Sequence, residues 1–587
     1  MKELFQVLVK IISALMSVIV SFTGMSFVSP EAVADSLAEL IFGVPYTAEA
    51  VERGFIDEID NSDIESVNEE TAFIKDKMMI FISSETNFFE KVKIINKTGG
   101  VLVGWCAPLE LYIISYLPMT FEQAEAKTKE LQTIEGIELA SPLFASKLAP
   151  QYVPDDPFFN EEEEIQVNQV WDELLPEGRN WWLEAVDARP AWAYEDYMDE
   201  IVTGICDSGF DLEHPELEGL ISFPNTKSAN RNIPDDHGTH VAGIVAAKRD
   251  NSQGIAGICG KADLMCVDWS PADLQLWIVD VAILFGFSNL VKTGAKVINF
   301  SVGSSNSLFG YTNTSLFTRL ESAIYSRSMA SLLSKGYDFV VVQSAGNGNY
   351  FGEPINAKEN GIFCGISEET AFLGSTGVSI DDILNRIIVV GAVENNFDGT
   401  FSQSIFSNIG SLISISAPGT DVYSSTYVYD YEIFSGTSMA APIVTAVASL
   451  VWSVNSDFDG AEVKDIVVTS YDTVAKPNAY AVDYYEGGFY EPEFCDYGVV
   501  NAKLSVEEAL LRTYEDFGSV EGSIIKEAKA EYVKFGDKEY TVYSDGSFSF
   551  VAPAGSGSLT AFDANGDEIA SAEITVEAGG ITFVKFN

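Results

Sequence analysis

The stretch Ile201-Val-Thr-Gly-Ile-Cys-Asp207 decides the fold of this 587-residue chain. It is a run of apolar and small residues without alternation, and it ends on a carboxylate. Such a run is typical of a strand that is buried on both faces of a parallel sheet. Asp207 then lies at the carboxyl end of the strand, the edge where open α/β sheets bind their ligands.

Similar apolar runs recur along the chain as far as about residue 515, and helical patterns separate them. They cover residues 264–267, 297–300, 339–342 and 387–390. Strands that alternate with helices imply right-handed crossovers and a sheet covered by helices on both faces. The sequence therefore predicts a three-layer α/β domain with a parallel sheet over residues 165–516.

Two further segments place a polar residue at the start of a helix. One is Asp236-His237-Gly-Thr-His240-Val-Ala-Gly243, where small residues follow a histidine. The other is Phe434-Ser-Gly-Thr-Ser438-Met-Ala-Ala-Pro442, which runs into an apolar helix. Taken alone, Asp207 is typical of a strand end and Ser438 of a helix N-cap.

Together, in the order Asp, His, Ser, these segments resemble the subtilisin-like serine peptidases, the subtilases. Smaller matches cover residues 297–303, 344–347, 388–392, 417–419 and 497–502, so the resemblance spans about residues 180–515. The chain departs from the family at Ile443, where a histidine is usual, and has extra chain at residues 304–335 and 350–385. These insertions leave the substrate preference open.

The resemblance assigns a role to four residues. Ser438 is the nucleophile, and His237 removes its proton and later protonates the leaving amine. Asp207 holds the imidazole in the required tautomer. The side-chain amide of Asn347 donates to the oxyanion together with the N-terminal amides of the helix at Ser438. By itself, Asn347 between two glycines is typical of a turn.

The resemblance also implies two substrate-binding segments. Ser301, Val302 and Gly303 present a backbone edge to an extended peptide. Ser344, Ala345 and Gly346 line one wall of the primary side-chain pocket. Because this wall is small and uncharged, it favours a small or apolar substrate side chain over a basic one. The sequence does not identify the opposite wall.

Composition narrows the function further. The chain has 34 Lys and Arg against 87 Asp and Glu, a net charge of −53 that argues against a nucleic-acid partner. Its only histidines are His214, His237 and His240, and the first and last are expected to be packed and hydrogen-bonded. Their spacing does not match a metal motif. The chemistry requires no cofactor; structural calcium agrees with the resemblance, but its ligands stay unassigned.

The N-terminus matches an export signal. Lys2 and Lys10 precede an apolar run over residues 11–28, and Ala32-Val-Ala34 offers a cleavage site. We therefore expect residues 1–34 to be a signal peptide, no integral membrane domain beyond it, and a secreted or cell-surface product. The alternative is an uncleaved anchor, because the run is nearly long enough to span a bilayer.

The remaining segments flank the α/β domain. Residues 35–72 form an acidic spacer, and residues 73–146 follow a β-α-β-β-α-β order that fits a subtilase pro-domain, with a permanent accessory domain as the alternative. Residues 147–164 form an acidic linker, and residues 517–587 an all-β sandwich that resembles carboxypeptidase-regulatory-like domains. Six cysteines are too few to staple the chain, and no specific pairing is predicted.

The sequence thus predicts an exported serine endopeptidase that acts on proteins or peptides through an acyl-enzyme. It would be made as a zymogen that processes itself and binds its own pro-domain. The alternative is a catalytically silent relative that serves as a surface binding or regulatory protein, although Asp207, His237, Ser438 and Asn347 are all present. A dedicated processing peptidase and a broad protease both remain open.

Overall fold

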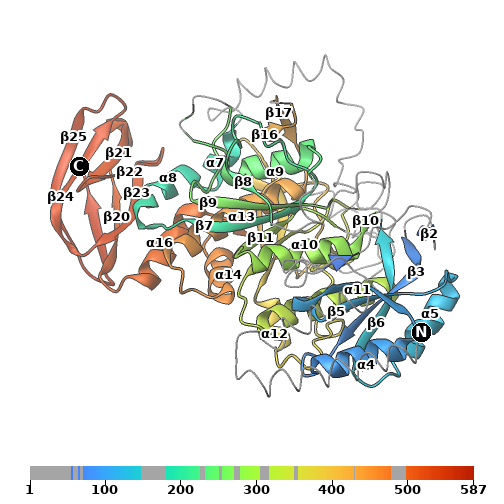
Figure 1. Cartoon of the computed structure of the whole chain (residues 1–587). Helices are drawn as coiled ribbons and strands as arrows, with labels where there is room; N and C mark the ends of the chain where they lie inside the picture. Colours follow the sequence, from blue (N-terminus) through green and yellow to red (C-terminus); the bar gives the residue numbers. More distant parts are fainter. Residues whose placement is uncertain are drawn as a thin grey trace, which may run out of the picture.

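The structure, a computed structural model, has three parts that follow one another along the chain (Figure 1). The predicted signal peptide, most of the spacer and the acidic linker lie outside the described residues. The structure describes residues 55–56, 64–66, 71–146, 180–224, 232–249, 251, 254–269, 278–303, 316–348, 354–428, 430–477 and 498–586.

The N-terminal unit confirms the predicted β-α-β-β-α-β order. Its elements are β3 (Thr71–Ile82), α4 (Phe88–Thr98), β4 (Val101–Cys106), β5 (Leu111–Ser115), α5 (Phe121–Leu131) and β6 (Ile137–Ser146). The strands form one antiparallel sheet in the order β4-β5-β3-β6. The predicted spacer adds two short strands to this sheet, β1 (Phe55–Ile56) and β2 (Ile64–Ser66), which sequence reasoning missed.

The two faces of this small sheet are buried against different partners. On β3, Phe73, Met78 and Ile80 pack in one cluster with residues of α4 and α5. The alternate residues Met79 and Phe81 pack in the cluster that contains the helices of the central domain. Since successive side chains of a strand point to opposite faces, the sheet is sandwiched between its own helices and the rest of the molecule.

The central domain is built on the predicted parallel sheet. Its core strands run in the order β15-β13-β12-β11-β7-β9, and all neighbours are parallel. The edges add two short parallel strands and two antiparallel ones that the sequence patterns did not predict. The core strands are β7 (Ile201–Asp207), β9 (Ala262–Asp268), β11 (Val297–Phe300), β12 (Val340–Ser344), β13 (Ile387–Asn395) and β15 (Ile415–Pro418); the edge strands are β8 (Ile221–Ser222), β14 (Phe401–Gln403), β18 (Thr473–Val474) and β19 (Gly498–Val499).

Helices cover both faces of this sheet (Figure 1). Val340 and Val342 of β12 pack in the cluster that contains α9 (Asp236–Ala246), α13 (Thr437–Val454), α14 (Gly460–Thr469) and α16 (Ala502–Thr513). The intervening Val341 packs in the cluster of α10 (Asp280–Lys292) and α11 (Leu316–Ser334). Continuous apolar strands are therefore explained by burial on two sides.

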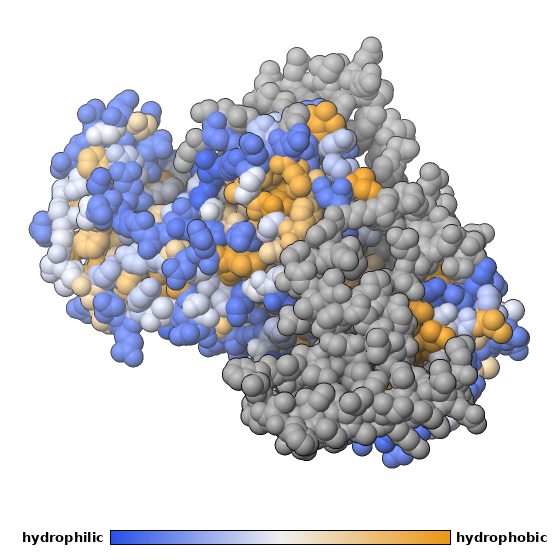
Figure 2. Space-filling view, in the orientation of Figure 1, coloured by the Kyte–Doolittle hydropathy of each residue, from blue (hydrophilic) through white to orange (hydrophobic). Residues whose placement is uncertain are grey.

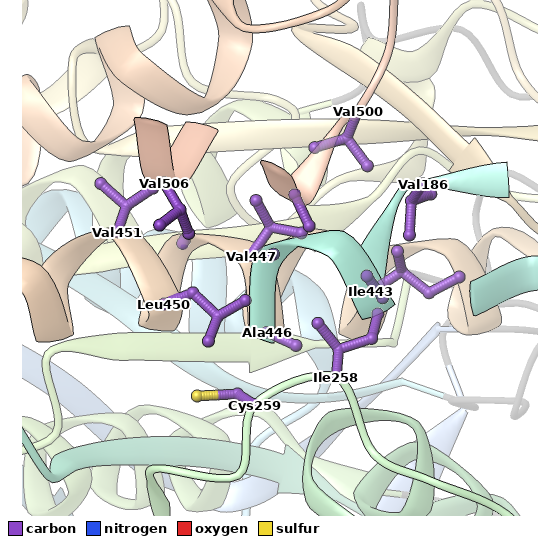
Figure 3. Packing of buried hydrophobic residues seen from close by; sticks show 14 of the residues in the cluster. Val186, Ile258, Cys259, Ile443, Ala446, Val447, Leu450, Val451, Val500 and Val506 are labelled. Atoms are coloured by element: carbon purple, nitrogen blue, oxygen red, sulfur yellow. The ribbon is translucent and has the colours of Figure 1, made fainter. Parts of the chain in front are cut away.

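Helix α13 forms the centre of the larger cluster. In Figure 3 its apolar side chains meet those of the segments around it, among them Val500 and Val506 near α16. Among the described helices it alone is long and apolar enough to cross a membrane, and it is completely buried in the protein. Its hydrophobicity is therefore accounted for by its place in the core.

Both insertions carry a helix, and both bond to the N-terminal unit. Helix α11 lies within residues 304–335, and α12 (Ile380–Leu384) lies within residues 350–385. Arg327 of α11 is fully buried and forms an ion pair with Glu138 of β6, at 2.8 Å. Ser375 of the second insertion donates to the same carboxylate through its backbone N and its hydroxyl, at 3.0 and 2.6 Å.

The C-terminal unit is the predicted all-β sandwich. Sheets of three and four strands face each other, and the strand β25 (Glu568–Val576), rich in small residues, was missed by pattern reading. Hydrophilic residues predominate on its surface in the view of Figure 2, in keeping with the acidic composition. The other strands are β20 (Phe517–Ser523), β21 (Ala530–Phe535), β22 (Lys538–Thr541), β23 (Ser547–Pro553), β24 (Gly555–Asp563) and β26 (Ile581–Lys585).

This unit is bonded directly to the central domain. The phenol of Tyr194 donates to Glu507 of α16 at 2.6 Å and accepts from the backbone N of Val551 in β23 at 3.0 Å. All three residues are buried. The sandwich is therefore an integral part of the folded chain.

The five described cysteines are all buried and unpaired. Cys495 lies outside the described residues, and the absence of a specific pairing stays a prediction. The remaining short elements are η2 (Ala107–Leu109), α7 (Trp181–Ala185), α8 (Ala188–Trp192), η4 (Glu195–Tyr197), β10 (Ile278–Val279), η6 (Ala357–Asn360), β16 (Val422–Thr426), β17 (Asp430–Phe434) and η7 (Lys526–Ala528).

Candidate active site

Asp207 lies at the carboxyl end of β7, as the sequence predicted, and β7 runs between β11 and β9 in the sheet. The side chain of Asp207 is completely buried, and its Oδ1 accepts a hydrogen bond from the backbone N of Ser208 at 2.7 Å. The same oxygen lies 2.6 Å from Nδ1 of His237. A strand end and a helix start, thirty residues apart, are therefore joined by one short contact.

His237 is positioned by the start of α9. Asp235 caps this helix, and its carboxylate accepts from the backbone N of His237 at 3.0 Å. Ser208 links the two sides, because its hydroxyl donates to Asp235 at 2.6 Å and accepts from the backbone N of Gly238 at 3.2 Å. Glycine is required at 238, since an added Cβ would lie 2.2 Å from the carbonyl oxygen of Ser208. Helix and strand thus meet at backbone distance.

The electrostatics of the pair favour a protonated imidazole. Burial alone lowers the pKa of His237, but the negative charge of Asp207, the hydrogen bond to it and the charge of Asp235 together raise that pKa above its ordinary value. The other ring nitrogen, Nε2, is buried and has no hydrogen-bond partner among the described residues. It is the ring atom that remains available to a nucleophile.

Ser438 lies in the first turn of α13 and does not cap it. The helix begins at Thr437, and its N-cap is Gly436, which offers no side-chain cap. The hydroxyl of Ser438 donates instead to the carbonyl of Ser301 at 3.2 Å, while the hydroxyl of Ser301 donates to the carbonyl of Ser438 at 2.8 Å. The described part of the chain contains no hydrogen bond between Ser438 and His237.

Asn347 lies against the same helix start. Its Oδ1 accepts from the backbone N and the hydroxyl of Thr437, at 2.8 and 2.9 Å. These bonds direct Nδ2 toward Gly436, where an added Cβ would lie 3.0 Å from that nitrogen and 3.6 Å from the backbone N of Ser438. Two donors therefore flank one space that glycine leaves open, at the positive end of α13. The simpler interpretation of Asn347 as a turn residue leaves this convergence unexplained.

The two segments predicted to bind substrate lie at the ends of neighbouring strands. Residues 301–303 come after β11, residues 344–346 begin with the last residue of β12, and Phe300 pairs with Gln343 across these strands. The carbonyl of Ser301 is engaged by Ser438, and that of Val302 by the side chain of Gln343. A peptide that paired with this edge would therefore compete with Ser438 for Ser301.

Sequence reasoning missed Asn360, which lies between these two segments. Its Nδ2 donates to the carbonyl of Ser344 at 2.9 Å, and the side chain is fully buried. A Cβ added at Gly303 would lie 2.1 Å from its Oδ1. Nothing in the sequence could have signalled this position, because an asparagine before Gly361 in inserted chain is typical of an ordinary turn.

His214 and His240 are packed and hydrogen-bonded, as expected. Nε2 of His214 lies 3.1 Å from the carbonyl of Asp430, and Nε2 of His240 lies 3.0 Å from that of Val422. Burial lowers the pKa of His240 to about 3, so this ring stays neutral. Within the described ranges, no group of three or more His, Cys, Asp or Glu side chains could hold a metal ion. Structural calcium stays a prediction without assigned ligands.

Comparison with known proteins places these residues within one matched region. The profile of the Subtilase family matches residues 198–487. The chain is 24% identical to a thermophilic serine proteinase of Bacillus sp. (strain AK1) over 76% of this chain and 94% of that protein. It is 29% identical to thermitase of Thermoactinomyces vulgaris over 51% of this chain and 86% of that protein.

A solved structure shares the fold over most of the chain. It is the crystal structure of fervidolysin from Fervidobacterium pennivorans, described as a keratinolytic enzyme related to subtilisin. The two structures superpose with a TM-score of 0.52 at 20% identity, and the match covers 91% of this chain and 82% of that one. Coverage of this extent includes sequence beyond the central domain.

Proposed function

Residues 198–487 of this chain belong to the subtilase family of serine peptidases, and on this premise we propose that it is an exported endopeptidase that works through an Asp207–His237–Ser438 triad and an acyl-enzyme. The observation that carries the proposal is the 2.6 Å contact between Asp207 and Nδ1 of His237. It supports an imidazole whose Nε2 is oriented as a base, with a serine at the start of a neighbouring helix.

The first chemical step is the attack of Ser438 on the substrate carbonyl. A serine hydroxyl is a weak nucleophile at neutral pH, so Nε2 of His237 takes its proton as the new C–O bond forms. Asp207 holds Nδ1–H toward itself and stabilises the cation that results. The imidazolium then protonates the leaving amine, and water releases the acyl group by the same steps in reverse order.

The negative charge on the carbonyl oxygen develops in the space beside Gly436. Nδ2 of Asn347 and the backbone N of Ser438 donate to it, and both are held before the reaction starts. Removal of one donor of this kind costs about 10²–10³ in rate. The catalysis proposed here uses only side chains and backbone groups of the chain.

Substrate binding prepares the nucleophile. A peptide that pairs with residues 301–303 brings an N–H to the carbonyl of Ser301, which Ser438 occupies in the free protein. The hydroxyl then turns to Nε2 of His237. Catalytic hydrogen bonds often form fully only in the substrate complex, so their absence in the free protein does not argue against the triad.

We further propose that the N-terminal unit is a pro-domain and that the chain is a self-processed zymogen. Its last strand β6 pairs with β10 of the central domain, and Glu138 is bonded to both insertions. The segment after β6, residues 147–164, is the acidic linker in which we place the cut. Export rests on residues 1–34 and their resemblance to a signal peptide.

Expression of the chain with and without Ser438→Ala tests the proposal. Wild type should cut itself within residues 147–164 and react with a serine-directed phosphonate, whereas Ser438→Ala should do neither. The matched control is Ser435→Ala in the same motif, because its hydroxyl serves only local loop contacts with Asp421, and it should label like wild type. If the Ser438→Ala protein still reacts with the phosphonate, the assignment of Ser438 as the nucleophile is wrong. A wild type that neither labels nor cleaves any peptide library would favour the silent relative.

A further inference from the structure

We propose that Asn360 closes the primary side-chain pocket and restricts cleavage to peptide bonds that follow a small residue, namely Gly, Ala or Ser. The inference rests on the proposed function and adds its substrate class. It concerns a residue from the inserted chain 350–385, which the family resemblance does not explain.

The position of the pocket follows from the two neighbouring strands. Gly303 and Gly346 lie just beyond the carboxyl ends of β11 and β12, on the two segments that flank the cleft. The nucleophile Ser438 is bonded to Ser301, two residues from Gly303. The space between the two glycines therefore lies beside the reacting carbonyl, where the side chain on its acyl side would enter.

The amide of Asn360 fills that space. A Cβ added at Gly303 would lie 2.1, 2.7 and 2.8 Å from Oδ1, Cγ and Nδ2 of Asn360, and these are its three nearest neighbours. A Cβ added at Gly346 would lie 2.7 Å from the same Oδ1. The side chain of Asn360 is thus in contact with both glycines, and it leaves no room for a side chain at position 303 or 346.

Several contacts hold the amide in this position. Nδ2 donates to the carbonyl of Ser344 at 2.9 Å, and the residue has no exposed surface. Asn356 caps the short helix η6 that carries Asn360, accepting from the backbone N of Lys358 at 3.1 Å. On the other side, Asn408 fixes the wall by donating to the carbonyl of Ala345 at 2.8 Å.

A large substrate side chain would have to expel this amide. Its bond to Ser344 would then be lost inside the protein, and a buried polar group without a partner is costly. A small substrate side chain does not have to displace the amide, because it does not reach past Gly303 and Gly346. Within the described ranges, Asn360 is bonded to the carbonyl of Ser344 and to the thiol of Cys364, and neither of these neutral groups would attract a basic side chain.

The test compares tetrapeptide p-nitroanilides that differ only in the residue before the scissile bond, which is Ala, Leu or Phe. Active-site titration with the phosphonate normalises each preparation, so only folded, reactive protein is counted. Wild type should prefer Ala over Leu at least ~10-fold in kcat/KM, and Asn360→Ala should reduce or invert this ratio by ~10-fold or more. Lys358→Ala, an exposed position on the same helix whose backbone N keeps the bond to Asn356, should keep the wild-type preference.

Two outcomes overturn the inference. The first is a preference of the wild type for Leu or Phe, a measurement that does not depend on the folding of any variant. The second is a preference that stays unchanged in both Asn360→Ala and Asn360→Ser. Failure of the proposed function is distinguishable, because wild type would then bind no phosphonate. In that case calorimetry can still test the pocket, by measuring how tightly the Ser438→Ala protein binds product peptides that end in Ala or in Leu. Equal affinity for the two peptides, or tighter binding of the Leu peptide, overturns the pocket assignment.

Discussion

The hydroxyl of Ser438 is bonded to the carbonyl of Ser301 at 3.2 Å, and Nε2 of His237 is left without a partner in the part of the chain that the structure describes. The proposed base is in contact with its carboxylate, and the proposed nucleophile is bonded to the residue that follows β11. The proposed triad therefore lacks one contact in the free protein, the hydrogen bond from Ser438 to His237. A substrate that takes the carbonyl of Ser301 would favour the formation of that hydrogen bond.

The raised pKa of His237 predicts the acid limb of the pH–rate profile. His237 must be neutral to act as a base, so kcat/KM should rise with pH through a midpoint above the ordinary histidine value of about 6.5. Because the chain has only three histidines, NMR of labelled rings can follow the titration in the Ser438→Ala variant.

The same spectra contain their own control. The ring of His240 should stay neutral until the pH approaches its pKa of about 3. Asp207→Asn removes the charge that raises the pKa of His237, so burial should then lower it, and kcat should fall by about 10⁴. A titration of His237 that is unchanged in Asp207→Asn would contradict the pairing.

Asn347→Asp separates the two roles of Asn347. The carboxylate can still accept from Thr437, which preserves the start of α13, but it replaces the Nδ2 donor with a negative oxygen. We expect kcat to fall by at least about 10² with little change in KM. Thermal unfolding should stay close to that of wild type, as it should for Asn356→Asp, which keeps full activity. A comparable loss in both variants would point to a general effect of charge.

Gly303→Ala tests the contact with Asn360 through stability. The new methyl group would meet the amide of Asn360 at about 2 Å, and overpacking of this kind costs about 1–3 kcal/mol. Since all three nearest atoms belong to Asn360, the double variant Gly303→Ala/Asn360→Ala should relieve the clash. Unfolding in urea should give a coupling free energy of about 0.5–3 kcal/mol, whereas strict additivity would show that the two residues do not touch.

Glu138→Ala tests the attachment of the N-terminal unit. Arg327 would be left as a buried charge without its carboxylate, and the loss of one partner in such a pair costs about 3–5 kcal/mol. Amide hydrogen exchange in β6 and α11, measured in the Ser438→Ala protein, should report this loss of stability. Glu130→Ala, which removes an exposed partner of Lys127, should change the same amides by no more than about 1 kcal/mol.

Acid should weaken the same contact. Hydrogen bonds from Ser375 and the charge of Arg327 outweigh burial and lower the pKa of Glu138. A carboxyl group whose pKa is lower in the folded state adds stability above its unfolded value, and this stability is lost as the pH falls through the folded value. The protection of the β6 amides, relative to their intrinsic exchange rate at each pH, should therefore fall below about pH 4. If the protection of these amides does not change in acid, the ion pair between Glu138 and Arg327 does not stabilise the attachment of the N-terminal unit.

Much of the catalytic geometry could be expected from residue order. The strand at residues 201–207 has no charged position before Asp207, so burial on two faces with the carboxylate at the end could be expected. Gly238 permits α9 to approach Ser208, which brings His237 to Asp207. The strand β25 was missed because small residues such as Ala570 and Ala572 weaken the alternation that identifies a strand.

By itself, the sequence determined the parallel sheet, the helices on its two faces and the segments that carry Asp207, His237, Asn347 and Ser438, because apolar periodicity and close-packed glycines leave little freedom there. Only the tertiary structure decided which side chains from other segments contact these residues. Asn360 comes from inserted chain with no periodic pattern, and it reaches the cleft because Ser344 accepts its hydrogen bond. The partner of Ser438 was likewise decided in three dimensions, since a hydroxyl chooses its acceptor from neighbours that chain order does not reveal.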